Sequence, residues 1–187
     1  AYIKFSSPAV SPDGNTVYAF SSGYHLAAFS KDGASLWTFD ATVHNPSPYC
    51  KDGTKNGNSC TPSVDSKGNI YIALAYNERD ANVVGTYSSG VYSIAPNGRQ
   101  NWYFDYGNAR YIAVIPVIFE DLGQVILTTK ANPSKTDYPA IWEAYGGQDN
   151  GHALNIADGS FAESLQVKQG NYGGSVGFKN GTFITHC

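Results

Sequence analysis

The sequence predicts an all-β chain built from repeated four-stranded units. A phrase of two short apolar strands around a Gly turn occurs four times, and the first three copies carry evenly spaced prolines, Pro8, Pro62 and Pro116. Within each copy, side chains alternate with the strand period of two, and β-branched and aromatic residues are frequent. Helical spacing is nearly absent. Self-similarity at a period of roughly 50 residues in such sequence indicates a β-propeller or another β-array.

Each unit begins with a short strand, a tight turn and a second strand. In the first unit, residues 7–10 lead through Asp13 and Gly14 to residues 16–20. Glycine suits such turns because it adopts positive φ without steric cost. The later copies occupy residues 61–64 and 67–74, residues 115–118 and 123–126, and residues 174–177 and 180–183.

A second phrase supplies the third and fourth strands of each unit. A strand leads through a Gly turn to a tryptophan four residues after the glycine, at Trp37 in the first unit and at Trp102 in the second. The third copy keeps the turn but has Glu163 at the tryptophan position. Four strands per unit are therefore expected.

The repeats define the expected domain organisation, a single propeller segment over residues 1–187. The blade units span approximately residues 6–40, 60–105 and 113–166, with a partial unit at residues 173–187. The last unit stops at Cys187, which we align with Phe20 and Leu74 in the second strands of the first two units. The chain thus ends inside a unit.

This order of strands, Gly turns and tryptophans resembles the repeat of the quinoprotein-alcohol-dehydrogenase-like propellers, often called PQQ-like repeats. The resemblance covers nearly the whole chain. In that family the tryptophan closes over the neighbouring blade, which implies that Trp37 and Trp102 are blade-packing residues. The chain lacks the Gly-His and Trp-Asp signatures of WD repeats and the recurrent paired glycines of kelch repeats. The expected fold class is an all-β propeller of four-stranded antiparallel blades.

About three complete blades and part of a fourth make an incomplete ring, because propellers usually have about four to eight blades. The open ends would expose apolar flanks and unpaired strand edges, which invite pairing with other chains. We therefore predict that the ring is completed by the remainder of the same polypeptide, by a copy of the chain in a homo-oligomer, or by another protein chain.

Composition and charge exclude several partners. The 187 residues carry a formal charge of -3, and Lys and Arg are scattered, so no basic patch points to nucleic acid. No run approaches the roughly 18 apolar residues that a membrane span needs. The start at Ala1 and the lack of methionine fit a processed or internal segment of a longer precursor.

The cysteines favour an extracellular or periplasmic location. Cys50 and Cys60 bracket a loop of turn-forming residues that could not bury a core of its own. We predict a disulfide there, with two free thiols as the alternative, and disulfides persist in oxidising compartments. Cys187 is then left over, which suggests an interchain bond or a partner in sequence not included here. Asn180 fits the N-glycosylation pattern, although the same residues also fit an Asn-Gly hairpin turn.

The insertions gather on one face of the expected disc. Short Gly turns join the first to the second strand and the third to the fourth, whereas the opposite face carries the Cys50–Cys60 loop, residues 76–82 and residues 130–151. Function tends to lie on loops held by a rigid scaffold. The contact candidates there are aromatic residues that could stack on a sugar or hold a partner chain, or alternatively pack on the propeller surface: Tyr138, Trp142 and Tyr145.

No pattern predicts catalysis or a metal site. Loop oxygens at residues 77–80 and 149–152 do not match the calcium-loop spacing. The histidines, His25, His44, His152 and His186, are expected to make ordinary hydrogen bonds. Single carboxylates are interpreted as turn or surface groups: Asp65, Asp105, Glu120 and Asp121. We assign no catalytic, cofactor-binding or metal-ligating residue.

The function predicted from these features is a non-catalytic extracellular or periplasmic propeller. It would act as a binding or assembly scaffold through its insertion-bearing face and its open edges. A glycan-binding propeller is one alternative. The other is a fragment of a dehydrogenase that uses pyrroloquinoline quinone and calcium, as the resemblance allows. The chain has no adjacent cysteine pair of the kind that those dehydrogenases often place beside the quinone, so we lean against an enzyme.

Overall fold

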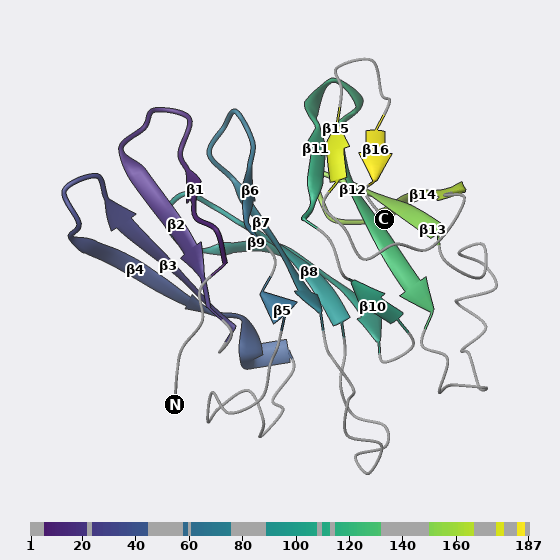
Figure 1. The fold of residues 1–187 in the computed structure, drawn as a ribbon, viewed down its shortest axis with the longest axis horizontal. Helices are drawn as coiled ribbons and strands as arrows, with labels where there is room; N and C mark the ends of the chain where they lie inside the picture. Colours follow the sequence, from purple (N-terminus) through teal and green to yellow (C-terminus); the bar gives the residue numbers. More distant parts are fainter. Residues whose placement is uncertain are drawn as a thin grey trace, which may run out of the picture.

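The computed structural model describes residues 6–21, 24–44, 58–59, 61–75, 89–107, 110–112, 115–131, 150–166, 175–177 and 183–185. These residues form an all-β propeller segment in which antiparallel blades stand side by side, with the N-terminal blade at one end and the C-terminal strands at the other (Figure 1). The segment contains three blades and part of a fourth, so the ring is incomplete.

Blade 1 is a four-stranded sheet whose strands pair in chain order. It consists of β1 (Ala9–Val10), β2 (Thr16–Phe20), β3 (His25–Ser30) and β4 (Ser35–Asp40), and the 3-10 helix η1 (Ala41–His44) follows it.

Blades 2 and 3 repeat this plan, but two short segments share the place of the first strand. Blade 2 contains β5 (Asn58–Ser59), β6 (Ser63–Val64), β7 (Ile70–Ala75), β8 (Ser89–Ile94) and β9 (Gln100–Gly107). Blade 3 contains β10 (Arg110–Ile112), β11 (Val117–Phe119), the 3-10 helix η2 (Glu120–Leu122), β12 (Gln124–Ala131), β13 (Asn150–Asn155) and β14 (Phe161–Gln166). Both β5 and β6 pair with β7, and both β10 and β11 pair with β12.

A proline accounts for the split in each first strand. Pro62 separates β5 from β6, and Pro116 directly precedes β11. Proline has no N–H to donate to a ladder, so pairing stops there and resumes beyond it. In blade 1 the Ser6 N–H donates to the Phe20 carbonyl at 2.8 Å on the other side of Pro8. The repeated prolines therefore mark the break in each first strand, a feature that sequence analysis did not predict.

The register of the strands corrects one detail of the sequence alignment. Ala9 faces Tyr18 in blade 1, and the equivalent Ser63 faces Tyr71 in blade 2. Tyr18 thus corresponds to Tyr71, and Phe20 corresponds to Ala73 rather than to Leu74. The cause is a shorter turn in blade 2. There the Asp65 N–H donates to the Asn69 carbonyl, whereas in blade 1 the Ser11 N–H donates to the carbonyl of Thr16, one residue further along. A slip of one residue moves a side chain to the other face of its strand.

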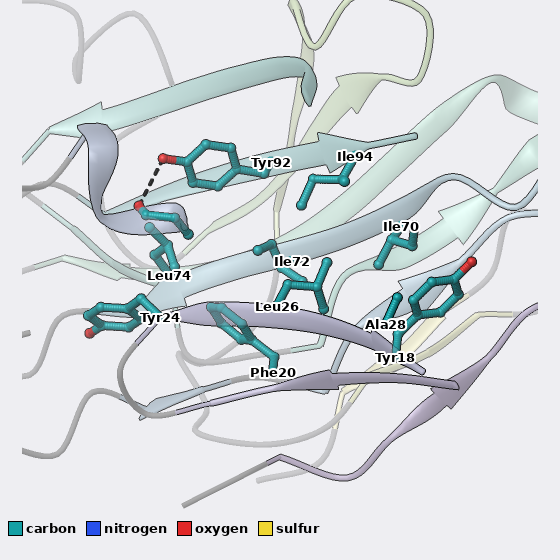
Figure 2. Close-up of a cluster of buried hydrophobic side chains, with 11 residues drawn as sticks. Tyr18, Phe20, Tyr24, Leu26, Ala28, Ile70, Ile72, Leu74, Tyr92 and Ile94 are labelled. Atoms are coloured by element: carbon teal, nitrogen blue, oxygen red, sulfur yellow. Dashed lines mark hydrogen bonds between the residues drawn. The ribbon is translucent and has the colours of Figure 1, made fainter. Parts of the chain in front are cut away.

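The core lies between the blades. Side chains on one face of blade 1 meet those on the facing side of blade 2 (Figure 2), and the buried members of this cluster are Tyr18, Phe20, Tyr24, Leu26, Ala28, Ala41, Ile70, Ile72, Leu74, Tyr92 and Ile94. A second cluster joins blade 2 to blade 3 through Tyr71, Ala73, Val91, Trp102, Val125, Leu127 and Leu154. Each interior strand therefore serves two interfaces, with alternate side chains pointing to opposite neighbours.

The fourth unit is represented by one hairpin. β15 (Ser175–Gly177) pairs with β16 (Phe183–Thr185), and β15 lies against β11 of blade 3. Among the residues that the structure describes, no helix has the length and apolarity needed for a membrane span.

Candidate functional site

Trp37 joins blade 1 to blade 2. Its side chain projects from β4 over the β8–β9 turn, where its Nε1–H donates to the Pro96 carbonyl at 3.0 Å. Gly98 in that turn has φ of 85°, and a Cβ added to it would lie 2.8 Å from Cδ2 of the indole. The ring of Tyr18 lies behind the indole at a centroid distance of 5.9 Å. Glycine is needed here both for the turn and for the close approach of the indole.

Trp102 makes the same contact between blades 2 and 3. Its Nε1–H donates to the Ile156 carbonyl at 2.8 Å, and a Cβ added to Gly159 would lie 2.5 Å from the indole. The Tyr71 ring lies behind it at a centroid distance of 5.9 Å. Blades 1 and 2 therefore each extend an indole to the Gly turn of the next blade along the chain.

Glu163 occupies the corresponding place in blade 3. Trp37 pairs with Ala28, Trp102 pairs with Ser93, and Glu163 pairs with Ala153. A bulge precedes this position in all three blades. Blade 3 therefore has a carboxylate residue where the other two blades have an indole.

A buried carboxylate organises the first turn of blade 2. Asp65 is 3% exposed, so its interpretation as a surface group is wrong, although it does form a turn. Its Oδ1 accepts from the Lys67 and Asn69 N–H groups at 3.0 and 2.7 Å, and its Oδ2 accepts from the Asn69 amide at 2.8 Å and the Tyr71 hydroxyl at 2.9 Å. Burial and the neighbouring Asp65 raise the pKa of Tyr71 above its ordinary value of 10.0. Four donated hydrogen bonds account for the burial of this carboxylate.

Further polar contacts tie the blades together along these turns. Glu120 in η2 accepts from Ser66 of blade 2, through the backbone N–H at 2.6 Å and through the hydroxyl. Tyr92 of blade 2 donates its hydroxyl to the Ala41 carbonyl of η1 at 3.0 Å (Figure 2). The fully buried His152 packs edge-on against Phe161 at a centroid distance of 5.7 Å. The Glu120 and Tyr92 hydrogen bonds therefore join neighbouring blades, whereas the His152–Phe161 contact lies within blade 3.

Among the described residues, none from another blade clusters with one apolar sheet face of blade 1. It consists of Val10, Val17, Ala19, Ala27 and Phe29, hereafter the outer face. The equivalent positions of blade 2 belong to the cluster shared with blade 1: Val64, Ile70, Ile72, Tyr92 and Ile94. In blade 3 the equivalents Ile118, Val125, Leu127 and Leu154 belong to the cluster shared with blade 2, and the fifth equivalent is His152.

The exposure of these positions differs sharply. Ile70, Ile72, Tyr92 and Ile94 are each 0% exposed, whereas Val10 is 54% exposed and the other four outer-face residues are partly exposed. The turn beside this face is also open, because a Cβ added to Gly33 would meet no atom within 4 Å. Gly33 is the equivalent of Gly98 and Gly159, which both lie under an indole.

Several candidate residues lie outside the described residues. They are Tyr138, Trp142, Tyr145, Cys50 and Cys60 of the insertion-bearing face, together with Cys187 and Asn180, so their predicted roles stay predictions. Within the described part of the chain, no group of three or more His, Cys, Asp or Glu side chains could hold a metal ion.

The fold and the stacked blade contacts define the chain as part of a β-propeller protein. No family model and no curated protein matches the sequence. The solved structures that are similar in fold include the following three. They are a protein of unknown function from Bacteroides caccae (11% identity, TM-score 0.53), the WD40 repeats of RRP9 (12%, 0.58) and a europium-containing methanol dehydrogenase (14%, 0.52). At such identities the similarity shows the fold alone.

The same comparisons show the extent of the match. The alignments cover 97%, 94% and 87% of this chain but only 52%, 42% and 27% of the three solved chains, respectively. The chain therefore spans about half or less of the propeller-containing proteins that it resembles.

Proposed function

We propose that this chain is part of a non-catalytic PQQ-like propeller that serves as a binding or assembly scaffold outside the cytoplasm, in the extracellular space or the periplasm. The observation that carries the proposal is the outer face of blade 1. Val10 is exposed there and the four other apolar residues are partly exposed, whereas most of their equivalents in the other blades are buried, and exposed apolar surface of this kind marks an interaction site. The repeated contact of an indole with a Gly turn supports the PQQ-like assignment.

The partner surfaces of this scaffold are the outer face and the insertion-bearing edge. The first would be covered by the rest of the ring or by another chain. The second carries Tyr138, Trp142 and Tyr145, which we propose as contacts for a protein or a glycan. Large aromatic rings bury much area at low entropic cost and are therefore common at binding interfaces.

The assembly part is tested by placing a charge on the outer face. Val10→Asp introduces a carboxylate at a position that a partner would bury, and Val43→Asp is the control because Val43 is 69% exposed on η1. Sedimentation of the complete protein should show loss of the native assembly, or a lower denaturation temperature, for Val10→Asp only. Equal behaviour of the two variants contradicts an assembly role for this face.

The non-catalytic and extracellular parts have separate tests. Purified native protein should show no quinone absorbance band and no dye-linked alcohol oxidation, and either signal would favour the dehydrogenase alternative. Peptide mapping under non-reducing conditions should recover Cys50 linked to Cys60, and a free thiol at both positions contradicts the disulfide. A mass that falls on reduction would place Cys187 in an interchain bond.

A further inference from the structure

The Gly33 turn has the same length as the Gly98 turn, which receives an indole, and the Gly159 turn, which receives the other indole, is one residue longer. The Ser30 N–H donates to the Ala34 carbonyl. In the same way, the Ala95 N–H donates to the Arg99 carbonyl and the Asn155 N–H donates to the Ser160 carbonyl. The next residue in each turn is then Lys31, Pro96 and Ile156, and the last two supply the carbonyls that accept the indole N–H groups. Lys31 therefore carries the equivalent carbonyl in blade 1.

The backbone of the turn is also already in the receiving conformation. Gly33 has φ of 87°, compared with 85° for Gly98 and 73° for Gly159. Nothing lies within 4 Å of a Cβ added to Gly33. The outer face continues from this turn across β3, β2 and β1, as the covered faces do in blades 2 and 3. A complete seat for a preceding blade is therefore present and uncovered.

We propose that this seat holds a further blade of the same polypeptide, and that a tryptophan in the fourth strand of that blade lies over Gly33 and donates its indole N–H to the Lys31 carbonyl. Blade 1 is then the blade at which the ring closes. This inference rests on the proposed scaffold function, because it names the occupant of the outer face. The interface continues the pattern of the two established blade interfaces.

A second copy of this chain is a poorer occupant. Both indoles of its described residues, Trp37 and Trp102, already lie over its own Gly98 and Gly159. Its third blade has Glu163 at the position from which the indole would extend. The solved propeller chains, of which this chain covers 52% or less, have room for additional blades in one polypeptide. These observations favour the same chain as the source of the missing blade.

The first experiment measures whether the outer face is covered. Hydroxyl-radical footprinting of the complete protein purified from its own source should show loss of modification at Val10 and Phe29. Val43 is the exposed control for Val10, and Phe39, which packs against blade 2, is the control for Phe29. Modification of Val10 comparable to that of Val43 overturns both this inference and the assembly role proposed above.

The second experiment measures whether an indole occupies the seat. Gly33→Ala and Gly14→Ala place a methyl group at positive φ, 87° and 72°, with no neighbour within 4 Å in either case. They should therefore cost the same strain unless an indole covers Gly33. In the complete protein we expect Gly33→Ala to lower Tm by about 4–8 °C more than Gly14→Ala, because overpacking adds to the strain.

The outcomes separate the two proposals. A protected outer face with equal Tm losses for Gly33→Ala and Gly14→Ala overturns the indole contact and leaves the scaffold function intact. A protected outer face in a dimer, with protection lost on dilution to the monomer, assigns the seat to a second copy and overturns the same-polypeptide source.

Discussion

Replacing Trp102 with alanine removes the indole that joins blade 2 to blade 3. The side chain is 7% exposed, and an indole of this kind buries about 150–250 Å². At about 25 cal/mol per Å² this area corresponds to roughly 4–6 kcal/mol, an upper estimate because unfolded chains are partly compact. Large aromatic truncations cost about 3–5 kcal/mol when measured. We therefore expect Trp102→Ala to lower the free energy of unfolding by about 4 kcal/mol.

The control for Trp102→Ala is Trp37→Ala. Both indoles cover a Gly turn and donate to a backbone carbonyl, but Trp37 is only partly buried. Its truncation should cost about 2 kcal/mol, since less surface returns to water. Trp102→Phe is a third variant, which keeps a ring over Gly159 but leaves the Ile156 carbonyl without its donor, at a cost of about 1–3 kcal/mol.

Urea unfolding followed by far-UV circular dichroism measures these differences, because fluorescence would change with the removal of a tryptophan. The slope of the free energy against urea should stay constant among the variants if the folded state is unchanged. A Trp102→Ala cost below about 1 kcal/mol, or one smaller than the Trp37→Ala cost, would refute the reasoning that this contact stabilises the blade pair.

Three further perturbations test other parts of the structure. Gly90→Ala would place a Cβ 2.2 Å from the Tyr103 ring and should lower the free energy of unfolding in urea by about 1–3 kcal/mol. A Gly90→Ala, Tyr103→Leu double variant should recover most of this loss, and additive losses contradict the contact. Burial is the main cause that raises the pKa of Tyr103 above its ordinary 10.0, and the charge on Asp105 is the second. The stability that the neutral hydroxyl contributes is therefore fully present below pH 10.0 and falls as pH rises further. Tyr103→Phe should reduce that loss. Hydrogen bonds from Ser11 and Asn15 lower the pKa of Asp13 from 3.8 to about 2. The contribution of the Asp13 carboxylate to folding stability is therefore present above pH 3.8 and is lost as pH falls through about 2. An Asp13→Asn variant with an unchanged acid-unfolding profile argues against such a contribution from this turn.

The blade plan could be predicted from sequence because each part of it has a local cause. Positive-φ glycines close the turns, alternation sets the strand faces, and the spacing from Gly98 to Trp102 repeats that from Gly33 to Trp37. The register then puts Glu163 in the position of the tryptophans, as the spacing indicates. These features depend on a few neighbouring residues, so a single sequence contains them.

The rest depends on contacts between distant residues. The alignment of Phe20 with Leu74 was wrong because the first turns of blades 1 and 2 differ in length. The hydrogen bonds donated by the Ser11 and Asp65 N–H groups set these lengths, and the spacing of the prolines does not reveal them. The buried Asp65 accepts a hydrogen bond from the Tyr71 hydroxyl, which lies beyond the turn in the next strand and is not part of the local turn pattern. Only the recurrence of Asp and Asn around the Gly turns hinted at such carboxylate-centred turns.

The contact of an indole with a Gly turn gives each blade two different sides, one that extends and one that receives. Such an interface is heterologous, so repeated contacts add up in one rotational direction and end only when the last side meets the first. A two-fold dimer through the outer face would pair two receiving sides, and neither Trp37 nor Trp102 would lie between them because both already cover turns of their own copy. An interface of the kind that joins blades 1, 2 and 3 instead needs an extending side opposite the receiving side of blade 1.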